Sequence, residues 1–144
     1  MLAITEVEDI RVLSLADFEK YGKPAKIVKL FGGKVQYERA VKELEEKGLL
    51  EDSQGAKIVN LEEYNMPPCI IITSAGTTIY ATRDITAFID RVNTYKFDKM
   101  VYVVGAEQKL HFEQFFKVLE KMGYEEYVKK AVHVPFGLVV DKDG

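Results

Sequence analysis

The sequence contains no tryptophan, one cysteine and two histidines among its 144 residues. A lone cysteine, Cys69, cannot form an internal disulfide, which is typical of proteins kept in a reducing compartment. Cysteine and histidine are also too few and too scattered to build a Cys/His metal cluster, so no metal site is expected. No apolar run is long enough to cross a bilayer, and the start MLAITEVEDI lacks the basic-then-apolar pattern of a signal peptide. We therefore expect a cytoplasmic protein without a membrane partner.

The chain also lacks an excess of positive charge. Its formal net charge is −3 and its isoelectric point is about 5.5. A domain whose main task was to bind nucleic-acid phosphates would usually be basic. The chain taken alone is therefore expected to bind RNA poorly. Its hydrophobic share of 47% and charged share of 30% are ordinary for a globular protein, and its length suits a single core.

The first part of the chain, residues 1–66, mixes helical and strand-like patterns. A capping box at Ser14 opens a short helix, and apolar residues at helical spacing predict a longer one that Gly48 ends. The elements expected here are helices over 15–20 and 35–47 and strands around 49–50 and 56–61, with the polar turn EDSQG between the strands. This part is interpreted as an N-terminal α+β segment.

The second part, residues 67–144, has a sharper pattern. The elements expected here are a hairpin over 69–73 and 77–81, a helix over 82–92, a buried strand over 100–105, a helix through the phenylalanines of 112–119, and a strand over 131–140. Pro135 makes the last strand irregular or an edge strand. Helices alternating with apolar strands predict an α/β fold with a parallel sheet.

Three polar residues follow expected strands at places where such sheets bind ligands, beyond the carboxyl ends. Tyr80 is expected at the end of the hairpin and Asp84 in the first turn of the next helix. Gln108 comes shortly after the strand that Gly105 ends. A carboxylate matches the planar fork of a guanidinium, with two parallel hydrogen bonds. The three side chains could therefore converge on one planar cation.

Each of these residues also has a simpler interpretation, and the pattern alone leaves the alternatives open. Asp84 in a first helical turn could be an ordinary helix cap. Tyr80 could be a core or cross-strand aromatic, and Gln108 could be a solvated helix start. His111 and His133 could face the same crevice or could simply pack. The phenylalanine stripe is interpreted as core without a function.

Two longer blocks carry a resemblance to a known family. The blocks YATRD, at 80–84, and GAEQKLHF, at 105–112, resemble the class I arginyl-tRNA synthetases, and the resemblance continues over roughly 40–144. It implies that residues 67–144 form the second half of a Rossmann-like, nucleotide-binding catalytic domain. It implies that residues 1–66 are an insertion-like segment that precedes this half. The poorly matching stretch 21–35 is shorter than its counterpart in the family.

The resemblance also implies roles for single residues. Tyr80, Asp84 and Gln108 match the residues that hold the arginine substrate, the first two through its guanidinium. The residues that match the ATP site are Gly105, Glu107, His111, His133, Phe136, Gly137 and Leu138. Enzymes of this family join Mg-bound ATP and L-arginine into an arginyl-adenylate and pass the arginyl group to tRNA-Arg.

The departures from the family pattern bear on activity. Its His-x-Gly-His signature is absent, because His111 and His133 are the chain's histidines, and its Lys-Met-Ser-Lys type loop would begin after Gly144. No catalytic residue is assigned, and the chain is expected to be a fragment that binds arginine and part of ATP but is inactive alone. Two alternatives are a free-standing arginine- or nucleotide-binding module and a remnant that binds nothing. Cutting a parallel sheet exposes an edge and apolar surface, so self-association is also expected.

Overall fold

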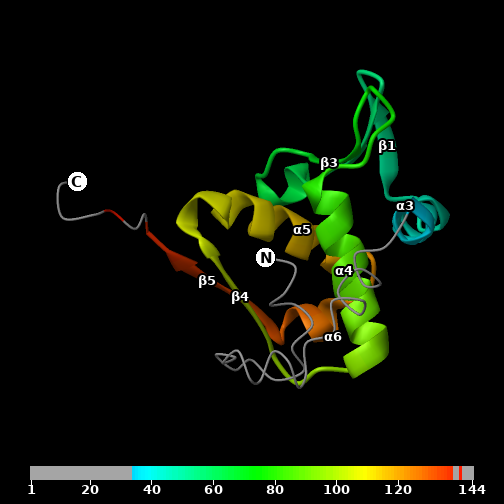
Figure 1. Ribbon diagram of the computed structural model, residues 1–144. Helices are drawn as coiled ribbons and strands as arrows, with labels where there is room; N and C mark the ends of the chain where they lie inside the picture. The colour runs from blue at the N-terminus through cyan, green and yellow to red at the C-terminus, as the bar shows by residue number, and fades with distance from the viewer. Residues whose placement is uncertain (1–33, 138–139, 141–144) are drawn as a thin grey trace.

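The computed structural model of the 144-residue chain describes residues 34–137 and 140. The elements in chain order are α3 (Lys34–Glu46), β1 (Leu50–Ser53), β2 (Ala56–Val59), a 3₁₀ turn η2 (Glu62–Tyr64), β3 (Cys69–Ile72), α4 (Tyr80–Tyr95), β4 (Met100–Gly105), a 3₁₀ turn η3 (Ala106–Gln108), α5 (Lys109–Lys121), α6 (Glu125–Val128) and β5 (Ala131–Phe136). Figure 1 shows their arrangement. The helix expected over 15–20 lies outside the described residues.

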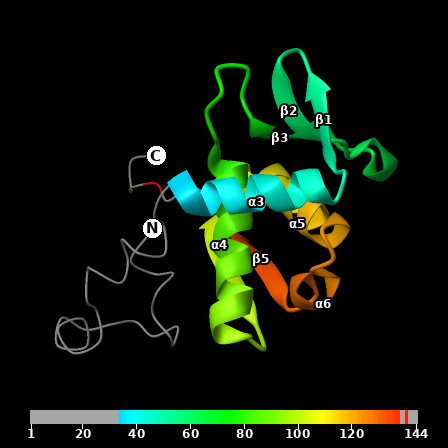
Figure 2. The ribbon, with the colours of Figure 1, turned by 90° about the vertical axis from the view of Figure 1, so that its right-hand side faces the viewer.

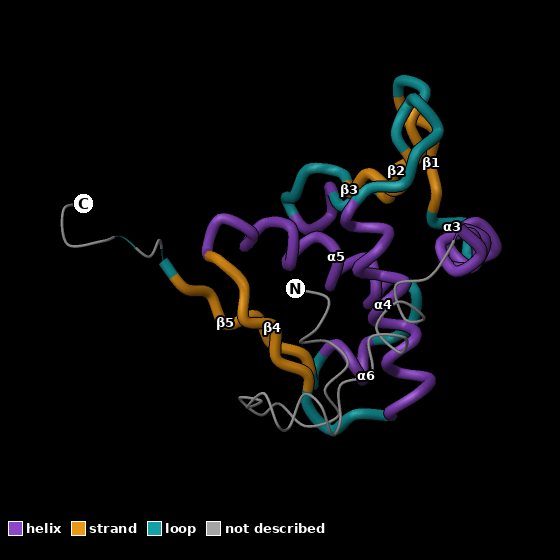
Figure 3. Tube along the Cα trace, in the orientation of Figure 1, coloured by secondary structure: helices purple, strands orange, loops and turns teal. Residues whose placement is uncertain are grey.

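In the part of the chain that the structure describes, the strands form two separate sheets, one antiparallel and one parallel. The order β1-β2-β3 is antiparallel throughout, whereas β4 and β5 pair in parallel. Figure 3 shows these sheets on opposite sides of the region occupied by α4 and α5. The expected α/β class with a parallel sheet is confirmed. The pairing of β2 with β3 joins residues on both sides of position 66, and the division of the chain there stays a prediction.

The turn between β1 and β2 is tighter than expected. Gln54 and Gly55 both have positive φ, 49° and 80°, as the central residues of a two-residue hairpin turn require. The expected five-residue turn EDSQG is therefore wrong, because β1 continues through its first three residues, paired with β2. Polar side chains are tolerated there because β1 is an edge strand with a solvated face.

The hairpin expected over 69–73 and 77–81 is also wrong. Its first arm is β3, but β3 pairs with β2, and the second arm contributes only the isolated bridge between Ile72 and Thr78. The chain turns instead into α4 at Tyr80. The buried Thr82 hydroxyl donates to the carbonyl of Ile71, which ties the start of α4 to the end of β3. A tertiary contact thus overrides the local preference of the β-branched residues for a strand.

The core lies between the helices and the two sheets. α3 lies across α4, as Figure 2 shows, and buries Leu44 completely. Phe88 of α4 and Phe115 of α5 are also fully buried, and Phe112 is 5% exposed. The interpretation of the phenylalanine stripe as core is therefore confirmed. The helices expected over 35–47 and around 112–119 are confirmed as α3 and α5, whereas α6 was not expected.

The parallel pair β4–β5 is covered on one of its faces by described residues. Tyr102 and His133 of the inner face pack against the phenylalanines of α5. The alternating side chains form an outer face of exposed apolar residues: Val103 (56% exposed), Val132 (38%), Val134 (45%) and Phe136 (50%). The expected strand over 100–105 is confirmed, but its complete burial is wrong. The expected exposed apolar surface is present on this outer face.

The end of β5 also differs from the expectation. β5 contains Pro135, pairs with β4 alone in the described part of the chain, and stops at Phe136 rather than at position 140. A proline has no amide hydrogen to donate, so it is accommodated where the strand has a free side. The expectation of an edge strand is confirmed.

Candidate functional site

The contact that joins the candidate residues is between Asp84 and His111. Asp84 lies on α4 and His111 on α5, and Nε2 of the imidazole is 2.5 Å from Oδ2 of the carboxylate. The Asp84 side chain is 38% exposed and the His111 side chain is 21% exposed. The first turn of α5 is thereby connected to the second turn of α4.

This geometry corrects the interpretation of Asp84 as an ordinary helix cap. α4 begins at Tyr80 rather than at position 82, so Asp84 falls in its second turn. The N-cap residue is Ile79, which makes no side-chain capping bond. The Asp84 carboxylate is used between two helices and not at the end of its own.

Aromatic rings hold His111 in place. Its ring centroid lies 5.5 Å from that of Phe112 and 5.4 Å from that of Phe115. Tyr102 lies beneath the same phenylalanines. Burial raises the pKa of the Tyr102 hydroxyl, the charge of Arg91 lowers it, and the charge of Asp84 raises it. His111 therefore both packs against aromatic rings and contacts Asp84. The charge of Asp84 also acts on the Tyr102 hydroxyl of β4.

Tyr80 is the first residue of α4 and is 77% exposed, so the interpretation as a core or cross-strand aromatic is wrong. Because it precedes Asp84 by four residues, the two lie on the same face of the helix. The guanidinium carbon of Arg83 lies 5.7 Å from the Tyr80 ring centroid and 6.0 Å from that of Tyr37. This is the range of cation–π contacts.

Gln108 ends η3 and precedes α5 directly. Its side chain is exposed and makes no capping bond, as a solvated helix start would. Gln108 lies one turn before His111, so it belongs to the end of α5 that contacts α4. The structure thus brings Asp84 and His111 into contact and sets Tyr80 beside Asp84. Among the described residues, no hydrogen bond joins Gln108 to Tyr80 or Asp84.

The carboxyl ends of β4 and β5 lie side by side. Gly105 pairs with Phe136 at the last position of the parallel register. Gly105 is buried, and a Cβ added there would overlap the carboxylate of Glu107. The glycine therefore allows Glu107 to fold back over the strand end, where ligands of open parallel sheets bind.

The His133 ring packs just short of the carboxyl end of β4, against Val104 and Phe112. Its Nε2 lies 2.9 Å from the carbonyl oxygen of Val104, and its ring stacks on Phe112 with centroids 4.2 Å apart. The imidazole is thus engaged between the sheet and α5. Gly137 is exposed just beyond β5, and Leu138 lies outside the described residues.

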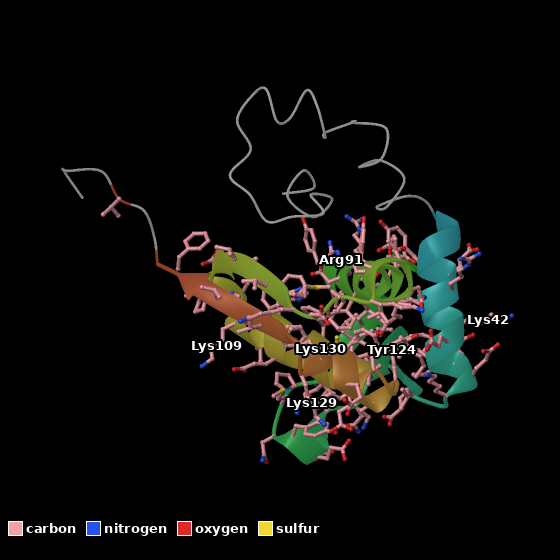
Figure 4. All side chains as sticks on the ribbon, turned by 90° about the horizontal axis from the view of Figure 1, so that it is seen from below. Lys42, Arg91, Lys109, Tyr124, Lys129 and Lys130 are labelled. Carbon is pink, nitrogen blue, oxygen red and sulfur yellow. The ribbon has the colours of Figure 1, made fainter. Side chains whose placement is uncertain are left out.

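A cavity between α3 and α4 was missed by the sequence analysis. It has a volume of about 160 Å³ and is lined by Arg39, Ala40, Glu43, Thr86, Ile89, Asp90, Asn93 and Tyr124. Tyr124, labelled in Figure 4, lies on the α3 side of the core. Its hydroxyl donates a hydrogen bond to Glu43 of α3. Nothing in the local pattern distinguishes Asp90 from a surface residue of a helix. The cavity forms only where α3 crosses α4.

Replacing Asp90 with asparagine is expected to leave the protein at least as stable at pH 7, with a gain of up to about 1 kcal/mol. Oδ2 of Asp90 is buried and has no hydrogen-bond partner in the described part of the chain. Burial raises the pKa of this carboxyl above 3.8, against the lowering effect of Arg39 and Arg91. An acid whose pKa is raised by folding binds more protons in the folded state than in the unfolded state. The wild type therefore loses stability as the pH rises from the pKa of the unfolded state through the higher pKa of the folded state.

Urea unfolding at pH 4 and pH 7 measures this effect. Asp90→Asn cannot titrate, so its stability relative to the wild type should improve between these values. A variant that is clearly less stable at pH 7 would show that the ionised carboxylate makes a favourable interaction in the folded state.

The part of the chain that the structure describes contains neither a candidate metal site nor a candidate membrane-spanning helix. No group of three or more His, Cys, Asp or Glu residues there could hold a metal ion. None of the helices over those residues has the length and apolar character needed to cross a bilayer.

Comparison with family models matches residues 33–144 to the catalytic domain of the class I (R) tRNA synthetases. An arginine–tRNA ligase of Halothermothrix orenii is 60% identical over 104 residues, which is 72% of this chain. An arginine–tRNA ligase of Clostridioides difficile is 54% identical over 106 residues, or 74% of the chain. The matches span 18% and 19% of these relatives' lengths.

A solved structure shares the fold. The arginyl-tRNA synthetase of Plasmodium falciparum matches with a TM-score of 0.65 at 23% sequence identity. The match covers 85% of this chain and 24% of that protein. At this identity the likeness concerns the fold alone.

Proposed function

Because the chain belongs to the arginyl-tRNA synthetases, through the class I (R) catalytic-domain family that matches residues 33–144, we propose that it carries the arginine-recognition part of that domain. The observation that supports the proposal is the Asp84 carboxylate, held between α4 and α5 and still 38% exposed. The full-length enzyme would use ATP to attach arginine to tRNA-Arg.

The proposed arginine site consists of Tyr80, Asp84 and Gln108. The carboxylate would accept parallel hydrogen bonds from the guanidinium, which is planar and permanently charged. Tyr80 is exposed on the same helix face and would add its hydroxyl or its ring, and the amide of Gln108 would contact the rest of the arginine. The exposure of Tyr80 and Gln108 supports this assignment, because neither side chain is committed to the core.

ATP, with its Mg²⁺, is proposed as the second substrate at the carboxyl ends of β4 and β5. Glu107, over the Cβ-free backbone of Gly105, has oxygens that could accept hydrogen bonds from ribose hydroxyls. His111 lies on the next turn of chain and would line the same site. Phe136, Gly137 and Leu138 would contact the adenine, and His133 would take part through its backbone, since its ring stacks on Phe112.

Location and partners complete the proposal. A cytoplasmic location fits the buried free thiol of Cys69. tRNA-Arg would be bound only by the full-length enzyme, because this chain is acidic. Self-association through the outer face of β4–β5 is proposed because parallel sheets are normally covered on both faces.

Calorimetric titration of the 144-residue chain with L-arginine tests the proposed function. L-citrulline is the matched control, because it has nearly the same shape but a neutral ureido group in place of the guanidinium. Arginine is expected to bind with a dissociation constant in the millimolar range or tighter, and citrulline at least about tenfold more weakly, since charged hydrogen bonds add about 1.5–3 kcal/mol. No heat at millimolar arginine would refute arginine binding by this chain. Equal binding of both ligands would refute recognition by a carboxylate.

A further inference from the structure

We infer that His111 is a positioning residue for arginine recognition: it holds one oxygen of Asp84 so that the other oxygen faces the incoming guanidinium. This inference rests on the proposed function, because it gives Asp84 the guanidinium as its ligand. It assigns His111 a task separate from the ribose-lining role that the family resemblance implies.

The direction of the hydrogen bond follows from the chemistry of the pair. An ionised carboxylate can only accept hydrogen bonds, so the imidazole donates through Nε2. The bond involves Oδ2 of Asp84. A carboxylate has two oxygens with about four acceptor positions. Oδ1 and the remaining position on Oδ2 therefore stay available to a planar donor.

The relative burial of the two side chains sets which one meets the ligand. His111 is 21% exposed and Asp84 is 38% exposed, so the histidine is the inner partner and the carboxylate the outer one. A ligand arriving from solvent can reach Asp84 without displacing the histidine. The contact is therefore compatible with an occupied site.

The histidine is itself fixed by packing. Its ring lies against Phe112 and Phe115, which are 5% and 0% exposed. Asp84 comes from a different helix. Its chain neighbour Arg83 and the Tyr102 hydroxyl, on which its charge acts, make no hydrogen bond with it among those seen over the described residues. Without His111, the carboxylate could rotate among several rotamers. Ordering it would then oppose binding.

The test compares arginine and citrulline titrations of His111→Ala, His111→Gln and Gln114→Ala with those of the wild-type chain. His111→Ala should weaken arginine binding about tenfold while leaving citrulline binding nearly unchanged. His111→Gln should recover most of the loss, because its amide can donate to Asp84. Gln114→Ala is the matched control: it removes a hydrogen bond from the same helix to the carbonyl of Pro67 and should not change arginine affinity. Circular dichroism and urea midpoints establish that each variant is folded.

The outcomes separate this inference from the proposed function. If the wild type binds no arginine, the proposed function fails and the inference fails with it. If the wild type and His111→Ala bind arginine equally well, only the positioning role is refuted. The same holds if His111→Gln is as stable as the wild type but binds arginine as weakly as His111→Ala.

Imidazole ¹⁵N spectra of the wild-type chain provide a reading that does not depend on a variant's folding. The proton of His111 should reside on Nε2, and the signal should move when arginine is added and stay in place with citrulline. A His111 signal that does not respond to arginine would overturn the inference.

Discussion

Replacing Phe115 with alanine is expected to lower the free energy of unfolding by about 3–5 kcal/mol. Phe115 is fully buried on α5, and its ring centroid lies 4.6 Å from that of Phe116 and 5.2 Å from that of Phe112. It also contacts Tyr102 of β4 across the interface between helix and sheet. Truncation would leave a cavity in which these rings lose their partner. Domains of this size are stable by only about 5–15 kcal/mol, so much of the protein would be close to unfolding.

Phe136→Ala is the matched control for this substitution, since the same atoms are removed from a ring that is 50% exposed. Its effect is expected to stay below about 1 kcal/mol, because half of the ring is already in water. Urea unfolding followed by circular dichroism measures both variants at a single protein concentration. Equal losses would contradict the assignment of the core to the α5 side of the sheet.

Elements set by local patterns were predictable from the sequence. β4 has the expected bounds, and α3 differs from its expected range by one residue at each end. Gly48, with a φ of 65°, follows α3 where the left-handed conformation favours glycine. These features depend on periodicity and on single residues with unusual backbone angles, which a sequence displays directly.

Elements set by tertiary contacts were not predictable. Residues Thr77 to Ala81 have strand-like composition, yet the chain enters α4 because Thr82 bonds to Ile71, eleven residues earlier. The polar β1 is a strand because its tight turn and its partner β2 impose the register. The exposure of the outer face of β4–β5 was also not predictable, because the composition of a strand does not tell whether one or both of its faces are covered.

The candidate site divides in the same way. The family resemblance pointed to Asp84 and His111, but as parts of two different subsites. Their contact joins residues 27 positions apart and depends on how α4 packs against α5. α4 begins at Tyr80 rather than at the expected position 82. Asp84 therefore does not cap its own helix but connects α4 to α5 through His111. Distances of this kind are properties of packing, and no local pattern encodes them.

Replacing Asp84 with asparagine is expected to weaken arginine binding on the order of 100-fold. The substitution keeps the shape of the side chain but removes the charge that the guanidinium would pair with, and hydrogen bonds to charged groups are worth about 1.5–3 kcal/mol each. If the amide oxygen accepts from His111, the amide nitrogen faces the ligand and sets one donor against another. The fold should persist, because Asp84 is 38% exposed and asparagine keeps the size of the side chain and an oxygen that can accept from His111.

Asp90→Asn is the matched control for this loss, because it makes the same chemical change on the same helix, six residues further along. Asp90 lines the cavity between α3 and α4, whereas Asp84 contacts His111 of α5, so neutralising Asp90 should leave arginine affinity within about twofold of the wild type. Calorimetric titration of both variants with arginine gives the comparison. If both lose affinity alike, the effect reflects the net charge of α4 and not a carboxylate aimed at the ligand. If neither loses affinity, arginine is held by other residues and the assignment of Asp84 is wrong.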